Sequence, residues 1–295
     1  MSGPGATIRT AETARNERSC SCTDDSFAFT RVTAVAANAI IPQRLLQRLD
    51  DLGDVLAQRG DALALLGLGS VGVDLGRLDD HSDMDFFVVV DDGAKQRYLD
   101  SIDWLEQLHP VVFSFPNSID GRKVLFADGL FAEYAVFTLG ELRGASYPPG
   151  RLVWQRGDAP AGLESAGRVP GPSPYDDAEY QVNEALTNLY VGLHRDLRGE
   201  RLSAMRFIQV HAVDRLLTYL ELTEPAAGPK QDVFVVERGA ERRFGPDALP
   251  FARLAPGYAH NCEAALAMLE WLEARTEVSD VLAAAIRQLA LECDV

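Results

Sequence analysis

Basic charge is scarce in this sequence: 28 Lys and Arg stand against 44 Asp and Glu, a formal net charge of −16 over 295 residues. A surface this acidic repels nucleic-acid phosphates and anionic lipid unless its basic residues are strongly segregated, and here they are scattered along the chain. Long hydrophobic runs are also missing, since the longest candidate, residues 32–41, is interrupted by polar side chains and is shorter than the roughly 18 apolar residues of a membrane helix. We therefore expect no nucleic-acid partner, no membrane partner and a cytoplasmic location.

Cysteine is rare as well, with four residues, Cys20, Cys22, Cys262 and Cys293, and no CxxC pair or histidine at zinc-finger spacing. Such a pattern favours neither a disulfide framework nor a zinc site. Cys20 and Cys22 remain open as a redox or soft-metal pair, although their polar surroundings favour two exposed thiols. We expect all four cysteines to be reduced and unligated.

Hydrophobic residues make up 47% of the chain and charged residues 24%, which is typical of a soluble globular protein with a packed core. Apolar periodicity is absent from residues 1–26, and the composition shifts to Gly, Pro and Ser around residues 159–177. We predict a disordered tail over 1–26, a first domain over 27–158, a linker over 159–177 and a second domain over 178–295.

The two predicted domains differ in periodicity. In the first, the pattern predicts helices over 42–58 and 94–108, strands over 62–68, 83–90 and 111–115, a hairpin with strands over 123–127 and 130–137, and an edge strand over 152–154. In the second, it predicts helices over 178–197, 203–222, 258–274 and 278–291. The expected fold class is α+β (α/β), with an N-terminal mixed-sheet domain and a C-terminal all-helical bundle.

Two aspartates stand at the start of an otherwise apolar strand, in the run Ser82-Asp83-Met84-Asp85. Side chains at i and i+2 of a strand share a face, so Asp83 and Asp85 point the same way. Adjacent carboxylates repel unless a cation lies between them, and Mg²⁺ takes oxygen ligands of this kind while leaving positions for substrate phosphates. The pair therefore predicts a Mg²⁺ site and a phosphate-bearing ligand.

Gly69 and Ser70, at the end of the preceding strand, supply the complementary part, because glycine lets a phosphate approach the backbone and serine offers a hydroxyl and an N–H. We include Ser82 with them as a nucleotide-binding candidate. Glu133 lies inside the apolar run 131–137, where an uncompensated charge is costly, and it is the candidate third carboxylate.

Each of these pieces also has a structural interpretation. A Gly-Ser pair after a strand is often only a turn, and an Asp-x-Asp pattern is often a solvated strand entry. Glu133 could pair with Arg151 or face solvent, and His81 is better explained as a turn residue than as a ligand. The combination in this order is what makes the functional interpretation specific.

The segment GLGSVGVDLGRLDDHSDMDFFVVV resembles the core motif of the DNA polymerase β nucleotidyltransferase superfamily. The later DGLFAEYAVF, with RLVWQRGD after it, is similar to bacterial antibiotic nucleotidyltransferases, in particular the lincosamide type. The resemblance covers residues 62–156 well and the helical half only in general character. It implies that Gly69 and Ser70 hold the triphosphate, that Asp83 and Asp85 bind Mg²⁺, and that Glu133 is a third ligand or the general base.

The resemblance implies a nucleotidyltransferase that moves a nucleoside monophosphate from a nucleoside triphosphate to a hydroxyl of a small molecule, releasing pyrophosphate. The expected acceptor is a lincosamide or aminoglycoside antibiotic, and the expected state is a monomer or homodimer. Two alternatives stay open: an AMPylating, antitoxin-like enzyme that modifies protein side chains, and a non-catalytic nucleotide-binding protein of the same fold.

Overall fold

The computed structural model describes residues 41–165, 176–224, 228, 232, 234–244 and 248–293. The predicted tail and the middle of the predicted linker lie outside the described residues. Buried apolar side chains form three separate clusters among the described residues. Two of them lie within residues 45–147 and the third lies within residues 182–290. The chain therefore has a sheet part and a helical part, each with its own core.

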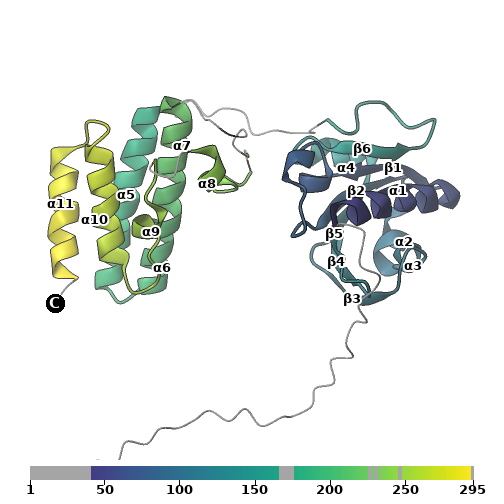
Figure 1. Cartoon of the computed structure of the whole chain (residues 1–295), viewed down its shortest axis with the longest axis horizontal. Coiled ribbons are helices and arrows are strands. Elements are labelled where there is room, and N and C mark those ends of the chain that lie inside the picture. The colour runs from purple at the N-terminus through teal and green to yellow at the C-terminus, as the bar shows by residue number, and fades with distance from the viewer. Residues whose placement is uncertain are drawn as a thin grey trace, which may run out of the picture. The chain divides into compact units, whose positions relative to one another are not determined.

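The sheet part has an α+β architecture, as the sequence predicts (Figure 1). Its strands are β1 (Ala62–Gly67), β2 (Met84–Val90), β3 (Val111–Pro116), β4 (Gly121–Phe126), β5 (Phe131–Thr138) and β6 (Arg151–Gln155). They form one mixed sheet in the order β3-β4-β5-β2-β1-β6, in which only the β2–β5 pair among these neighbours is parallel. The 3-10 turns η1 (Gly69–Val71) and η2 (Leu75–Arg77) join β1 to β2.

One face of the sheet packs on helices, because alternate strand residues are apolar. Residues such as Met84, Phe86 and Val88 of β2 are buried with Leu45, Leu49, Leu52 and Leu56 of α1 (Ile41–Arg59). Tyr98 of α2 (Lys95–Asp100) and Trp104 of α3 (Asp103–Glu106) complete this cluster. The opposite face is covered near Val89 by α4 (Leu139–Gly144) and Tyr147.

The predicted helix over 94–108 is wrong in one respect, because it divides into α2 and α3 at Ser101. Ser101 has extended backbone angles, and its hydroxyl donates to the Asp103 carboxylate at 2.8 Å. The Trp104 indole N–H donates to the carbonyl oxygens of Tyr98 and Ser101. These local bonds satisfy groups that a continuous helix would pair within itself.

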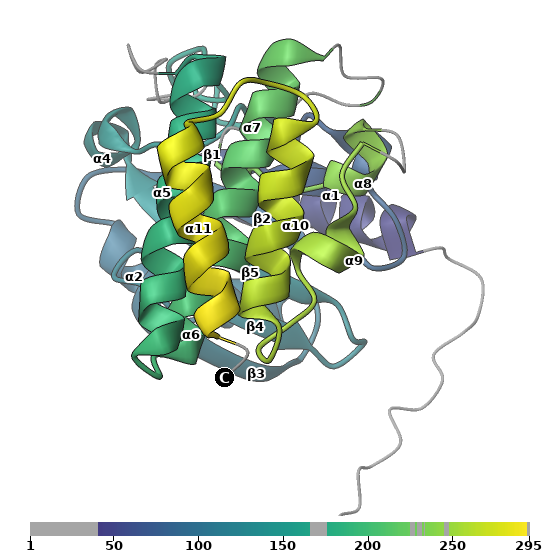
Figure 2. The same cartoon turned by 90° about the vertical axis from the view of Figure 1, so that its left-hand side faces the viewer.

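The helical part contains the predicted helices with one modification. Its elements are α5 (Ala178–Leu197), α6 (Arg201–Met205), the π-helical η3 (Arg206–Ala212), α7 (Val213–Thr223), α8 (Ala240–Arg243), α9 (Phe251–Leu254), α10 (Asn261–Glu273) and α11 (Asp280–Glu292). The predicted helix over 203–222 is thus a continuous helix whose central segment is π-helical. Helices α7, α10 and α11 pack against α5, as Figure 2 shows.

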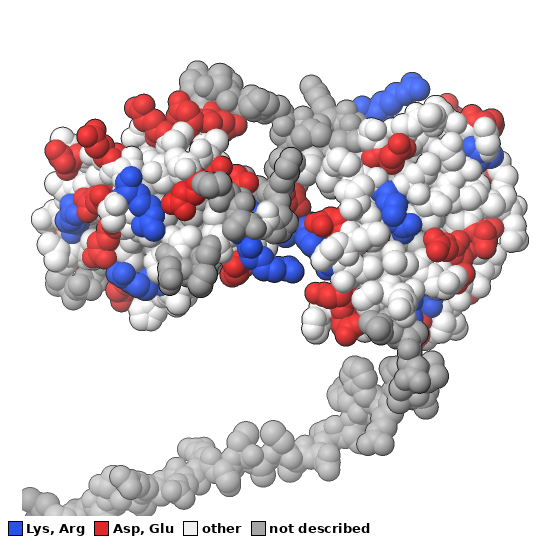
Figure 3. Space-filling view, turned by 45° about the horizontal axis from the view of Figure 1, so that its top comes forward, with Lys and Arg blue, Asp and Glu red and all other residues white. Residues whose placement is uncertain are grey.

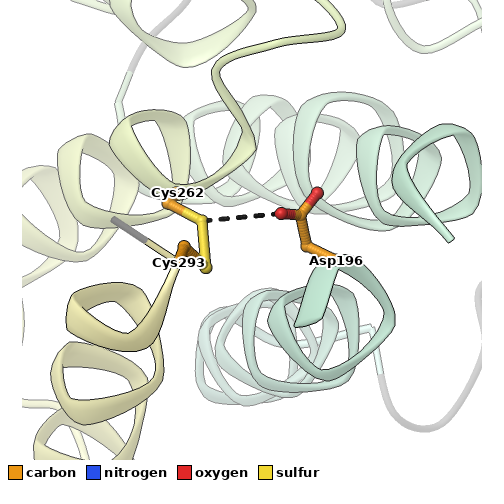
Figure 4. Close-up of side chains that lie close together, drawn as sticks. All are labelled: Asp196, Cys262 and Cys293. Carbon is orange, nitrogen blue, oxygen red and sulfur yellow. Dashed lines mark hydrogen bonds between the residues drawn. A yellow bond between two sulfur atoms is a disulfide. The ribbon is translucent and has the colours of Figure 1, made fainter. Parts of the chain in front are cut away.

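Two of the cysteines depart from the prediction of free thiols. Cys262, at the start of α10, and Cys293, directly after α11, form a disulfide with their Cα atoms 6.5 Å apart (Figure 4). The Asp196 carboxylate of α5 lies beside Cys262 Sγ. Antiparallel packing of α10 on α11 brings together residues that are 31 positions apart, a proximity that the spacing of the cysteines does not reveal. Cys20 and Cys22 lie outside the described residues.

Acidic side chains are spread over the molecular surface. On the face shown in Figure 3 they occur on both parts, with Lys and Arg interspersed among them. Within the described residues, no helix is long and apolar enough to cross a membrane.

Candidate nucleotide and metal site

The site begins at the turn after β1, which requires glycine. Gly69 has φ +53°, and a Cβ there would lie 3.2 Å from Asp85 Oδ2. The Leu68 N–H donates to the Asp85 carbonyl at 2.8 Å, so the turn leaves the sheet directly beside Asp85. Positive φ and close approach are both features that favour glycine over other residues. The sequence thus places a residue without a side chain, Gly69, next to the candidate metal ligand Asp85.

Ser70 lies inside this turn. The first hydrogen bonds within the turn are donated by the N–H groups of Val71 and Gly72, to the carbonyls of Leu68 and Gly69. The backbone N–H groups of Gly69 and Ser70 therefore lie at the open N-terminal end of the turn. Arg151 of β6 braces the turn, since its Nε donates to the Val71 carbonyl at 3.0 Å. The alternative that Arg151 pairs with Glu133 is therefore wrong.

Two of the candidate carboxylates, Asp85 and Glu133, lie on the half-exposed face of the sheet. Asp85 on β2 and Glu133 on β5 are direct partners in the parallel ladder, and such partners share a face. Asp83 lies one residue before β2 and is half-buried like the other two. The alternation that buries Met84 and Phe86 against the helices therefore turns Asp85 to the other side. Asp83 precedes the strand and lines a different hollow, so the shared orientation of Asp83 and Asp85 stays a prediction.

The electrostatics of Asp85 are unusual for a carboxylate. Burial, reinforced by the neighbouring charges of Asp83 and Glu133, raises the pKa of Asp85 to about 7. A pKa shifted by burial and like charges in a hollow is typical of functional sites. Gly69, Asp85 and Glu133 all line one hollow, together with Asn117 and Tyr147.

The donor set fits a hard divalent cation. Carboxylate oxygens are the ligands that Mg²⁺ prefers, and a cation between Asp83 and Asp85 would remove the repulsion that raises the Asp85 pKa. Among the described residues, the cluster of His, Cys, Asp and Glu ligand atoms lying within 4.8 Å of one another is Asp196, Cys262 and Cys293. The ligand atoms of Asp83, Asp85 and Glu133 therefore do not all lie within 4.8 Å of one another.

Glu133 instead contacts residues of the β3–β4 hairpin. Asn117 Nδ2 donates to its Oε1 at 2.6 Å, and Lys123 Nζ lies 3.0 Å from its Oε2. Neither residue is among the site residues predicted from the sequence. Lys123 could have been found, because a hairpin centred on Asp128 pairs residues equidistant from it, and Lys123 and Glu133 are such a pair.

Ser82 lies apart from the hollow of Asp85. Its hydroxyl accepts from the Asp79 amide at 2.9 Å, in a turn where the His81 amide donates to the Asp79 carboxylate. The hydrogen bond from His81, together with that from Ser82, holds the pKa of Asp79 below its usual value although burial opposes it. Ser82 and Asp83 line a second hollow with His81 and Phe131. His81 is a turn residue, as we expected.

No protein-family model and no curated protein matches this sequence. Among solved structures, the chain is similar to an aminoglycoside 6-adenyltransferase from Bacillus subtilis, with 12% identity, a TM-score of 0.29, and 83% of this chain and 91% of that chain covered. It is also similar to a nucleotidyltransferase-like protein from Exiguobacterium sibiricum, with 13% identity, a TM-score of 0.34, and coverage of 78% and 75%.

A third similar structure is a STING-associated CdnE c-di-GMP synthase from Capnocytophaga granulosa, with 10% identity, a TM-score of 0.29, and coverage of 87% and 81%. Two of the three are named for nucleotidyl transfer, an adenyltransferase and a nucleotidyltransferase-like protein.

Proposed function

We propose that this protein is a Mg²⁺-dependent nucleotidyltransferase that moves a nucleoside monophosphate from a nucleoside triphosphate to a hydroxyl of a small molecule. The observation that carries the proposal is the Asp85 carboxylate, whose pKa is raised to about 7 by burial and by Asp83 and Glu133, beside a glycine turn that admits a phosphate. A group so costly to ionise is expected where a cation binds.

Each residue of the site has a proposed role. Asp83 and Asp85 hold Mg²⁺, and the amides and hydroxyl of Gly69 and Ser70 hold the triphosphate. Mg²⁺ supplies charge neutralisation at the transferring phosphoryl group. Glu133 either completes the metal ligands or takes the proton of the acceptor hydroxyl.

The proposed acceptor is an antibiotic of aminoglycoside or lincosamide type. Both carry amines that are cationic at neutral pH, and a cation is attracted to a site with a local excess of carboxylates. We propose no nucleic-acid acceptor, because the net charge of −16 opposes binding to a phosphate backbone.

The test is transfer of labelled nucleotide from each of the four triphosphates, with Mg²⁺, to a panel of lincosamides and aminoglycosides. We expect label on an antibiotic with the wild-type protein and at least a thousandfold less with Asp85→Asn. Label on a protein would instead support the AMPylating alternative. Nucleotide binding with no transfer to any acceptor would contradict the proposal and support the non-catalytic alternative.

A further inference from the structure

Both oxygens of the Glu133 carboxylate have partners that point it in one direction. Oε1 accepts from Asn117 Nδ2 at 2.6 Å, and Oε2 lies 3.0 Å from Lys123 Nζ. Lys123 is the direct partner of Glu133 in the antiparallel β4–β5 ladder. Because β5 lies between β4 and β2, Lys123 and Asp85 lie on the strands that flank Glu133 on opposite sides, and the ion pair of Glu133 is on the Lys123 side.

The β3–β4 hairpin is built close to Glu133. The backbone N–H of Asn117 donates to the Gly121 carbonyl at 3.2 Å, which closes the loop. A Cβ at Gly121 would lie 2.4 Å from the Tyr134 carbonyl and 3.2 Å from Asn117 Oδ1. Only glycine allows the hairpin to approach β5 so closely. This approach brings the side-chain amide of Asn117 within hydrogen-bonding distance of Glu133.

Stability alone does not account for these contacts. The side chains of Lys123 and Glu133 are 36% and 41% exposed, and an ion pair at this exposure contributes little to folding. Asp128 shows how this sheet neutralises a structural carboxylate: it is 6% exposed and receives two arginines. Glu133 lines the same hollow as Asp85. An ion pair there can instead hold the Glu133 carboxylate in the orientation that a reacting group needs.

We propose that Lys123, together with Asn117, is a positioning residue that holds Glu133 apart from the metal ligands, so that Glu133 takes the acceptor proton while Asp83 and Asp85 alone ligate Mg²⁺. This inference rests on the proposed function and resolves the role it leaves open. The acceptor O–H bond breaks and its proton passes to the Glu133 carboxylate. The acceptor oxygen bonds to the α-phosphorus, and the bond from that phosphorus to the leaving pyrophosphate breaks.

The kinetic test compares Lys123→Met and Lys123→Arg with wild type. We expect Lys123→Met to lower kcat by about 10- to 100-fold while KM for the nucleotide changes by less than about twofold, and Lys123→Arg to recover most of kcat because it keeps the charge. Asn117→Ala, which leaves both charges, should lower kcat in the same way but less. A variant that raises KM and leaves kcat unchanged would overturn the proposal.

The binding test measures Mn²⁺ affinity by electron paramagnetic resonance, without substrate. Glu133→Gln and Lys123→Met should bind Mn²⁺ within about twofold of wild type, and Asp85→Asn at least tenfold more weakly. Weakening by Glu133→Gln as large as that by Asp85→Asn would make Glu133 a metal ligand and overturn the inference. Unchanged affinity in Asp85→Asn would instead contradict the proposed function itself.

A control removes a more exposed ion pair elsewhere. Arg253 pairs with Glu270 at 2.9 Å, and both side chains are 64% exposed. Arg253→Met should change neither kcat nor Mn²⁺ affinity. A loss of kcat in this control equal to that in Lys123→Met would show a general effect of charge removal and would overturn the positioning role.

Discussion

Two aspartates of the sheet part, Asp85 and Asp128, show how differently one fold can treat a buried carboxylate. Asp128, in the β4–β5 turn, receives Arg44 at 2.8 Å and Arg48 at 2.7 Å. Burial alone would raise its pKa, but the hydrogen bonds from Arg48 and Arg44 hold the pKa below its usual value. Burial raises the pKa of Asp85 to about 7, and its carboxylate neighbours Asp83 and Glu133 add to the shift.

The difference separates a structural role from a functional one. Asp128 ties α1 to the hairpin turn, so its charge is neutralised within the chain. Asp85 lies in a hollow where neighbouring charges make ionisation more costly, which is a condition that a bound cation would relieve. In the helical part, Asn261 donates to the Asp196 carboxylate at 2.7 Å, whereas burial and the charge of Glu237 raise the pKa of Asp214.

The largest expected effect is on transfer. Asp85→Asn keeps the shape of the side chain but removes its charge, so we expect at least a thousandfold loss of kcat, comparable to about 4 kcal/mol in transition-state stabilisation. Asp128→Asn should retain transfer within about threefold where both proteins are folded. Radiolabel transfer at saturating nucleotide measures both variants. Equal losses in the two variants would remove the distinction between the carboxylates.

Stability should show the reverse order. Asp128→Asn removes the negative charge that the Arg44 and Arg48 guanidiniums share, and we expect a loss of about 2–4 kcal/mol in the free energy of unfolding. Asparagine is tolerated in turns, so the loss reports the charge rather than the backbone. Urea denaturation measures it, with Asp50→Asn on the exposed side of α1 as the control. We expect the control to stay within about 0.5 kcal/mol of wild type.

The pH dependence of stability gives a subtler comparison. With a pKa of about 7 in the folded state and 3.8 as its ordinary value, Asp85 holds its proton in the folded protein between these values while the unfolded chain has lost it. The free energy of unfolding should therefore fall as pH rises from about 4 to 7, by at most about 4 kcal/mol, and level off above.

Asp85→Asn should lack this contribution. Urea denaturation of both proteins in a chelator, from pH 4 to 8, isolates it as the difference between the two curves, since the other titrating groups are common to both. Curves that run parallel across this range would contradict the raised pKa of Asp85.

Much of the sheet part is readable from the sequence because its signals are local. Alternation in residues 84–90 fixes which face is buried, and the Asp128-Gly129 dipeptide fixes the hairpin, where Gly129 has φ +88°. The helix α4 has a local signal too, since Thr138 and Glu141 form a capping box, although it is not among the predicted helices.

The remaining features depend on contacts between distant segments. The break at Ser101 depends on the hydrogen bond from the Trp104 indole to the Ser101 carbonyl. The Cys262–Cys293 disulfide depends on how α10 packs on α11. Within the site, the facing of Asp85 and Glu133 follows from strand periodicity once β2 and β5 are known to be neighbours. The contact between Asn117 and Glu133 has no local signal.

The most direct test of the central claim is Mn²⁺ binding to wild type, Asp85→Asn and Asp128→Asn, measured by electron paramagnetic resonance at pH 8, where Asp85 is ionised. The account predicts that wild type and Asp128→Asn bind Mn²⁺ equally and that Asp85→Asn binds at least tenfold more weakly. Equal affinity in all three proteins would contradict a cation site at Asp85.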